Sequence, residues 1–184
     1  GDEGAKLPGG SKNGASEYIQ LPDGFADQFK NGNTVTISAW IKNATAKANT
    51  AALYFGEKPA SNNMPTHYWL LNPNNPQGNY KSVITNATNA GAPYNTEVGN
   101  STSSTAAQIG KWANYTTVIA AGSITSYLNG VQVAKADRSL KLSDFADTLQ
   151  TYIGRSNYTG DPTWGGSIRD LRFYKDALTA DQVK

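Results

Sequence analysis

Acidic residues are the first place to look for chemistry in this chain, because glycoside cleavage needs two carboxylates about 5 Å apart in retaining enzymes. On a strand, such a pair requires acids at i and i+2 or i+4, on one face. Glu57, Asp161 and Asp170 each stand alone, and Asp144 and Asp147 fall in a segment that we expect to be a surface turn. The sequence therefore lacks the usual pattern of paired catalytic carboxylates.

Nucleophilic chemistry finds equally little support. His67 is the single histidine, there are no cysteines, and no Gly-x-Ser-x-Gly elbow occurs. A triad would have to use His67 as its base, whereas the simpler interpretation of His67 is a polar strand residue or a hydrogen-bond partner for a ligand. We predict that the chain is not an enzyme by itself.

Aromatic and polar residues gathered in loops favour carbohydrate binding instead. Sugars present apolar C–H faces on which aromatic rings stack, and hydroxyls that carboxylates, amides and guanidinium groups bind. The chain has four Trp and ten Tyr, and one short loop carries several candidates. The predicted ligand-binding residues are Glu57, His67, Trp69, Asn72, Tyr80, Arg155, Asn157, Tyr158, Asp161 and Trp164. For Trp164 the alternative is a position that plugs the end of the fold.

The elements that would position these residues are short strands with period-two alternation, separated by turns. The clearest strand is 34–42, in which Val35, Ile37, Ala39 and Ile41 share one face and Trp40 lies on the other. Asn129-Gly130 predicts a tight hairpin turn, and the polar segment 87–108 is long enough that we expect it to be functional or to contain short strands. The pattern predicts an all-β fold, a two-sheet antiparallel β-sandwich, as a single domain over residues 1–184.

Three segments carry a family resemblance in family order: "EYIQLPDGF…TVTISAWIK" at 17–42, "KWANYTTVIA…SYLNGVQVA" at 111–134, and "IGRS…W.GSIRDLRFYKDALTADQV" at the end. Together they resemble laminin-G-like, concanavalin-A-like jelly-roll domains, including carbohydrate-binding modules of bacterial glycoside hydrolases. The resemblance implies a ligand on the concave sheet and its rim loops, lined by residues 55–57, 67–72, 80–86, 94–97 and 155–164. It also implies core positions for Trp40 and Trp112.

Calcium is a separate implication of the resemblance. Many jelly-roll relatives hold a structural Ca²⁺ on the convex side, through oxygen ligands that include an acid in the last strand. Asp170 matches that acid, and Asp23, Asp2 and Glu3 are possible partners. The alternative is a solvated Asp170 beside a neighbouring arginine.

Composition restricts the partners. The net charge is +2 and only 16% of residues are charged, so there is no basic footprint for nucleic acid. No apolar run reaches the roughly 20 residues of a membrane helix. We expect a monomeric, secreted or wall-attached bacterial module, covalently linked to a catalytic domain. The alternative is an adhesin or protein-interaction laminin-G-like domain.

Overall fold

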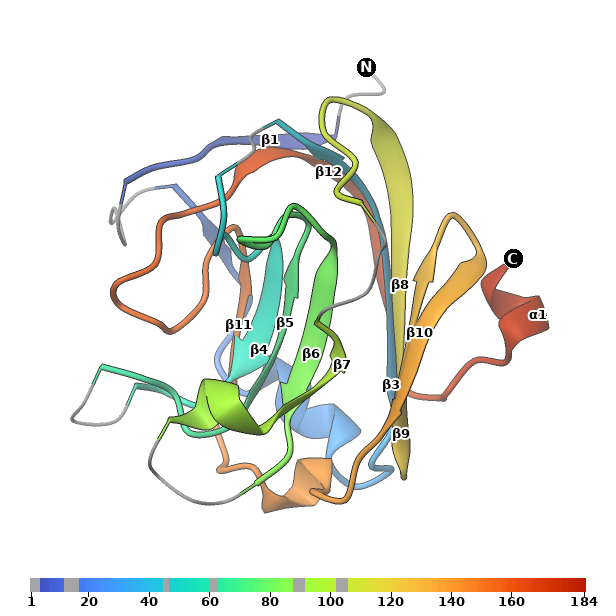
Figure 1. The fold of residues 1–184 in the computed structure, drawn as a ribbon. Helices are drawn as coiled ribbons and strands as arrows, with labels where there is room; N and C mark the ends of the chain where they lie inside the picture. The colour runs from blue at the N-terminus through green and yellow to red at the C-terminus, as the bar shows by residue number, and fades with distance from the viewer. Residues whose placement is uncertain (1–3, 12–16, 45–46, 60–62, 88–91, 102–105) are drawn as a thin grey trace.

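Two six-stranded antiparallel sheets stack face to face in the computed structural model, which confirms the predicted β-sandwich (Figure 1). The structure describes the chain except residues 1–3, 12–16, 45–46, 60–62, 88–91 and 102–105. Sheet A has the order β1 (Ala5–Pro8), β12 (Gly165–Tyr174), β3 (Val35–Asn43), β8 (Trp112–Ala120), β9 (Ser123–Leu128), β10 (Val131–Asp137). Sheet B has the order β2 (Ile19–Gln20), β11 (Gln150–Ile153), β4 (Leu53–Gly56), β5 (Tyr68–Asn72), β6 (Lys81–Thr85), β7 (Glu97–Asn100).

The core lies between the two sheets and follows the alternation of β3. Val35, Ile37, Ala39 and Ile41 are buried there, and Trp40 points to the other side, as predicted. Their counterparts from sheet B are Leu53, Phe55, Trp69, Leu71 and Ile84. Because one side chain in two reaches the core, the other half of each strand is left to the outer faces of the sandwich.

Sheet A bends around sheet B, so its solvent side is convex (Figure 1). Its strand β12 pairs with β1 on one side and with β3 on the other. The register of β12 against β3 shifts between Arg169 and Arg172, where Asp170 has a φ of 52°. A β-bulge of this kind tilts side chains locally, and Asp170 sits on it.

Local signals in the sequence are confirmed at the turns. Asn129 and Gly130 both have positive φ (51° and 78°), as a two-residue hairpin between β9 and β10 requires. Thr179 caps α1 (Ala180–Val183) in a reciprocal capping box with Gln182. The 3₁₀ turns are η1 (Phe25–Phe29), η2 (Pro93–Thr96) and η3 (Leu142–Asp144). The long polar segment 87–108 contains η2 and β7, so it is not structureless.

Among the helices that the structure describes, none combines the length and apolar character that crossing a membrane would need.

Candidate functional site

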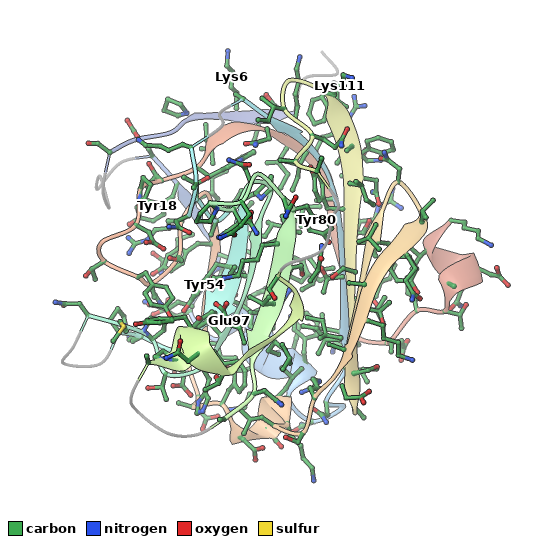
Figure 2. The ribbon with its side chains drawn as sticks, in the orientation of Figure 1. Lys6, Tyr18, Tyr54, Tyr80, Glu97 and Lys111 are labelled. Carbon is green, nitrogen blue, oxygen red and sulfur yellow. The ribbon has the colours of Figure 1, made fainter. Side chains whose placement is uncertain are left out.

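The solvent side of sheet B carries a layer of tyrosines, which we call the tyrosine face. Its members are Ala51, Tyr54, Tyr68, Leu70, Val83 and Tyr152, with Tyr18 and Tyr158 packed against them. The six members are at most 4% exposed. Figure 2 labels Tyr18 and Tyr54 along this sheet. The tyrosine face is therefore no open platform, and a ligand reaches only the side chains at its rim.

A short polar chain crosses the rim. The Tyr68 hydroxyl donates to Glu97 Oε1 at 2.7 Å, and the hydroxyls of Tyr68 and Tyr158 lie 2.7 Å apart. Lys81 Nζ lies 2.6 Å from Glu97 Oε2. Each of these contacts joins a different strand or loop: β5, β6, β7 and the 155–164 loop. The network therefore fixes the geometry of the rim.

Asp161 is electrostatically coupled to this network. Burial raises the pKa of its carboxyl to about 6; the charge of Lys81 acts to lower it and the charge of Glu97 to raise it. The attraction of Lys81 does not offset the hydration that the Asp161 carboxylate loses on burial, so the pKa stays raised. We call Lys81, Glu97, Tyr158 and Asp161 the rim cluster.

Arg155 lies at the neighbouring edge of the same face. Its guanidinium carbon is 4.7 Å from the ring centroid of Tyr18 and 4.8 Å from that of Tyr152. Its Nε donates to the carbonyl of Ser156 at 3.0 Å. Two aromatic rings thus hold the guanidinium plane by cation–π contact, and the side chain stays partly exposed.

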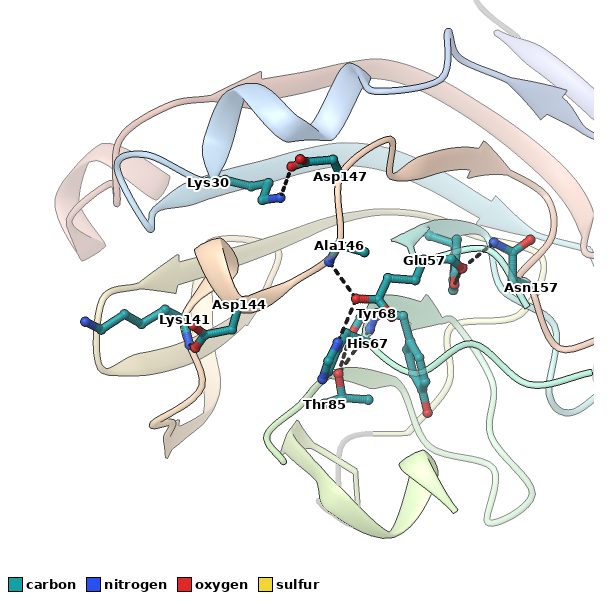
Figure 3. Close-up of polar contacts among 11 residues, drawn as sticks. Lys30, Glu57, His67, Tyr68, Thr85, Lys141, Asp144, Ala146, Asp147 and Asn157 are labelled. Carbon is teal, nitrogen blue, oxygen red and sulfur yellow. Dashed lines mark hydrogen bonds and ion pairs between the residues drawn. The ribbon is translucent and has the colours of Figure 1, made fainter. Parts of the chain in front are cut away.

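Glu57 and His67 form an internal pair (Figure 3). Glu57 Oε1 lies 2.7 Å from His67 Nδ1 and accepts the Ala146 N–H at 2.7 Å. Burial would raise the pKa of Glu57, but the hydrogen bonds from His67 and Ala146 outweigh it and the pKa is lowered. The His67 ring stacks on Phe145 at 5.1 Å. These contacts tie the segment after η3 to the ends of β4 and β5, which gives both residues a structural role.

Asn157 is hydrogen-bonded to the same internal region as Glu57 and His67. Its Nδ2 donates to the Glu57 carbonyl at 2.8 Å and to Gln150 Oε1 at 2.9 Å, and the residue is 1% exposed. The amide holds the 155–164 loop on sheet B. Its hydrogen-bonding capacity is used within the chain, so we remove Asn157 from the candidate site together with Glu57 and His67.

Three predicted aromatic ligands are core residues. Trp69 donates from Nε1 to Ser82 Oγ at 3.1 Å, and Trp164 donates from Nε1 to Asn43 Oδ1 at 2.9 Å. Tyr80 packs edge-on against Tyr115 in the core. All three are at most 1% exposed, so their rings offer no surface to a sugar. For Trp164 the alternative interpretation, a plug at the end of the sandwich, fits the structure.

Asn72 is also buried, and within the described residues its Oδ1 has no hydrogen-bond partner. Of the ten predicted ligand residues, the structure leaves Arg155, Tyr158 and Asp161 partly exposed at one rim. The ten named residues did not include Lys81 and Glu97, although the segments 80–86 and 94–97 that the resemblance implies contain them, and Tyr18 lies outside all the predicted lining segments.

The two described calcium candidates lie apart: Asp23 is in the turn that follows β2 of sheet B, and Asp170 is on β12 of sheet A. Asp23 accepts from Gln20 Nε2 at 2.8 Å and lies 3.7 Å from Lys58 Nζ, next to sheet B. Asp170 is exposed on β12 of sheet A. The described part of the chain holds no group of three acidic, His or Cys side chains suited to a metal ion. Asp2 and Glu3 lie outside the described residues, so calcium stays a prediction.

The structure contradicts the core position that the resemblance implies for Trp40. Its side chain is 36% exposed on the convex side of sheet A. Trp112, on the next strand, is half-buried on the same side, and the Arg169 guanidinium lies 4.4 Å from its ring centroid. Neither indole belongs to the core cluster between the sheets.

The two stacked antiparallel sheets, with rim loops over one of them, define a jelly-roll β-sandwich. The family profile described as the concanavalin A-like lectin/glucanases superfamily, a laminin G type, matches residues 13–184. The chain therefore belongs to that superfamily, as the resemblance of its sequence motifs indicates.

Individual relatives are more distant. An alpha-L-arabinofuranosidase of Bifidobacterium longum is 33% identical over 67 residues, which is 36% of this chain and 6% of that enzyme. Domain 4 of AbnA, a GH43 extracellular arabinanase from Geobacillus stearothermophilus solved with arabinotriose, superposes with a TM-score of 0.71 at 22% identity, over 98% of this chain and 80% of that one. The CBM40 of a Ruminococcus gnavus IT-sialidase gives 0.70 at 16% identity, over 99% and 95%. At these identities the two structures establish the shared fold.

Proposed function

We propose that the domain is a non-catalytic carbohydrate-binding module that binds glycan at the rim cluster and Arg155. Similarity to domains of an arabinanase and a sialidase, solved with arabinotriose and with sialyllactose, supports this class of ligand. The observation that carries the proposal is the partly exposed rim, where Asp161, Tyr158 and the Lys81–Glu97 pair converge from separate elements.

Tyr94 completes the chemistry that a sugar requires. It is 52% exposed on η2, and its phenol is one of the groups that raise the pKa of the Tyr158 hydroxyl. An exposed ring beside a polar cluster offers a stacking surface next to hydrogen-bonding groups. A shallow rim of this kind gains little net free energy from solvated hydroxyls, so affinities in the micromolar to millimolar range are expected.

The biological role that we infer is attachment. Fused to a secreted or wall-attached glycoside hydrolase, a weak module raises the effective concentration of that enzyme on its polysaccharide. Such a module works as a monomer. A catalytic role for Glu97 is disfavoured, since both of its carboxylate oxygens are engaged, by Tyr68 and by Lys81.

A glycan array, run with calcium and again with EDTA, tests the proposal. We expect one glycan class to bind, and Asp161→Asn and Tyr94→Ala each to weaken binding at least tenfold. Asp147→Asn is the matched control, because this carboxylate is exposed and pairs with Lys30 away from the rim. Loss of binding in EDTA would assign calcium a role in the site.

A blank array under both conditions would contradict the proposal and favour the adhesin or protein-interaction alternative. Equal binding by wild type, Asp161→Asn and Tyr94→Ala would keep the ligand class but remove the rim cluster as its site.

A further inference from the structure

A groove of about 510 Å³ lies on the opposite side of the sandwich, between the convex face of sheet A and the C-terminal segment. Its walls include Trp40, Asn114, Asp170, Arg172 and Tyr174. This volume falls within the roughly 300–1,000 Å³ of small-ligand sites. The rim cluster contributes no residue to it, so the groove is a separate feature.

The strand register places the groove residues in adjacent rows. Trp40 and Asn114 are cross-strand partners on β3 and β8. The next row is Arg172, Ser38 and Thr116. Because these side chains stand on paired strands of one sheet, the groove floor is rigid, as a binding site requires.

Polar side chains on the floor orient one another. Asn114 Nδ2 lies 3.2 Å from Ser38 Oγ, and Thr116 Oγ1 lies 2.9 Å from both Ser38 Oγ and Asn114 Oδ1. The backbone N–H of Asn114 donates to Asn129 Oδ1 at 2.8 Å. The amide of Asn114 is therefore held in one orientation beside the exposed indole of Trp40.

Asp170 adds a strained residue to this floor. A non-glycine residue at φ 52° inside a strand is uncommon, and such outliers concentrate at functional sites. The Asp170 carboxylate is exposed, and Arg172 lies near enough for the two charges to interact. The groove thus offers an acceptor and a donor whose charges offset each other.

We infer that this groove is a second binding site, for an uncharged oligosaccharide. The indole of Trp40 would stack on the apolar face of one sugar ring, while Asp170 accepts from hydroxyls and Arg172 donates to them. A neutral sugar fits because the charges of Asp170 and Arg172 offset each other and Lys184 is paired with Asp181, so no cation among the described lining residues is left over for an ionised ligand. The site lies on the other sheet from the rim cluster and does not depend on the function proposed for that rim.

The experiment is a titration of ¹⁵N-labelled protein, observed through the four indole N–H signals and the Asn114 amide. The probes are arabinotriose, lactose and 3′-sialyllactose, at up to millimolar concentrations. We expect a neutral probe to shift the Trp40 and Asn114 signals. The indoles of Trp69 and Trp164, bonded inside the core, should stay unchanged.

Trp40→Ala and Asp170→Asn should each raise the dissociation constant at least tenfold. Trp112→Phe is the matched control, since Trp112 lies on the same sheet face but does not line this groove. Trp40→Phe, which keeps a ring, gives a folded reference if the alanine variant is unstable. Asp161→Asn, at the rim cluster, should leave the Trp40 shifts intact.

No Trp40 shift with any of the three probes would overturn the inference. A shift with 3′-sialyllactose alone would overturn the neutral class of ligand. Loss of the Trp40 shifts in Asp161→Asn would show that the groove is no independent site, whatever happens at the rim.

Discussion

Aromatic rings cover both solvent-side faces of the sandwich, but the two faces treat them in opposite ways. On sheet B, Tyr54, Tyr68 and Tyr152 are almost fully buried under rim loops. On sheet A, Trp40 remains exposed beside an open groove. Ring content alone therefore does not locate a binding surface. What decides is whether a loop folds over the strand that carries the ring.

The loop 155–164 explains much of the difference. It leaves β11, crosses the tyrosine face and returns into β12, and its Tyr158 ring packs edge-on against Tyr68 at 5.4 Å. Trp164 N–H bonds to the Gly154 carbonyl at 2.8 Å, which closes the base of the loop. The convex side of sheet A is bordered instead by the short C-terminal segment that carries α1.

The largest difference in stability is expected when one ring is truncated on each face. Tyr54→Ala should cost about 3 kcal/mol or more of unfolding free energy, because it opens a cavity in a closed layer. Trp40→Ala should cost less than Tyr54→Ala, because about a third of the Trp40 side chain is already exposed and its loss leaves no closed cavity. Urea denaturation of both variants measures this, and similar losses would show that the faces are equally packed.

A smaller effect is expected from removing one hydroxyl of the tyrosine face. Tyr68→Phe deletes the donor to Glu97 and a partner of Tyr158, so it should destabilise the fold by about 1–3 kcal/mol. Tyr152→Phe is the control, since among the described residues nothing hydrogen-bonds to its hydroxyl. Thermal unfolding of the pair checks this; equal melting temperatures would mean that the Glu97 contact contributes little.

A pH series sharpens the comparison at the rim. Burial raises the pKa of Asp161 from its ordinary value of 3.8 to about 6, so between these pH values the native state binds more protons than the unfolded state. The contribution of Asp161 to stability therefore falls as pH rises from about 4 to about 6, by on the order of 1 kcal/mol. Denaturation of Asp161→Asn should lack this slope; parallel profiles for variant and wild type would contradict it.

The smallest expected effect comes from a substitution in the groove, and it is a gain in folding stability rather than a loss. Asp170→Gly removes the backbone strain of a residue with a left-handed φ, and it should stabilise the fold by about 0.5–1 kcal/mol. Asp170→Asn, which keeps a Cβ atom, is the control and should gain nothing. A melting temperature that drops in Asp170→Gly would mean that the Asp170 side chain supports the bulge.

Local features of the fold could be predicted because neighbouring residues determine them. The alternation of β3, the Asn129-Gly130 turn and the Thr179 cap each depend on a few adjacent residues. The family match likewise follows from motifs in a fixed order. These features needed no knowledge of distant contacts.

The site could be predicted only in part, because strand parity does not say which face is the core. Trp69 and Tyr68 occupy opposite faces of β5, both buried, and the sequence favoured the wrong one. The Lys81–Glu97 pair depends on the register in which β6 pairs with β7. A loop separates these two strands in the sequence, so the register cannot be read from neighbouring residues. The sequence does not show that the Asn157 side chain is already hydrogen-bonded, because its partner, the Glu57 carbonyl, lies a hundred positions away in the chain.

The pairing of β1 with β12 has a mechanical consequence. The strands are antiparallel, Ala5 lies opposite Ile168, and β12 continues in the same direction to Tyr174. The outward ends of both strands thus point the same way. Tension applied through these two strands would load their hydrogen bonds one after another, as in a zip, rather than all together in shear. Under such tension the β1–β12 pairing would separate one hydrogen-bonded pair at a time, beginning at Ala5.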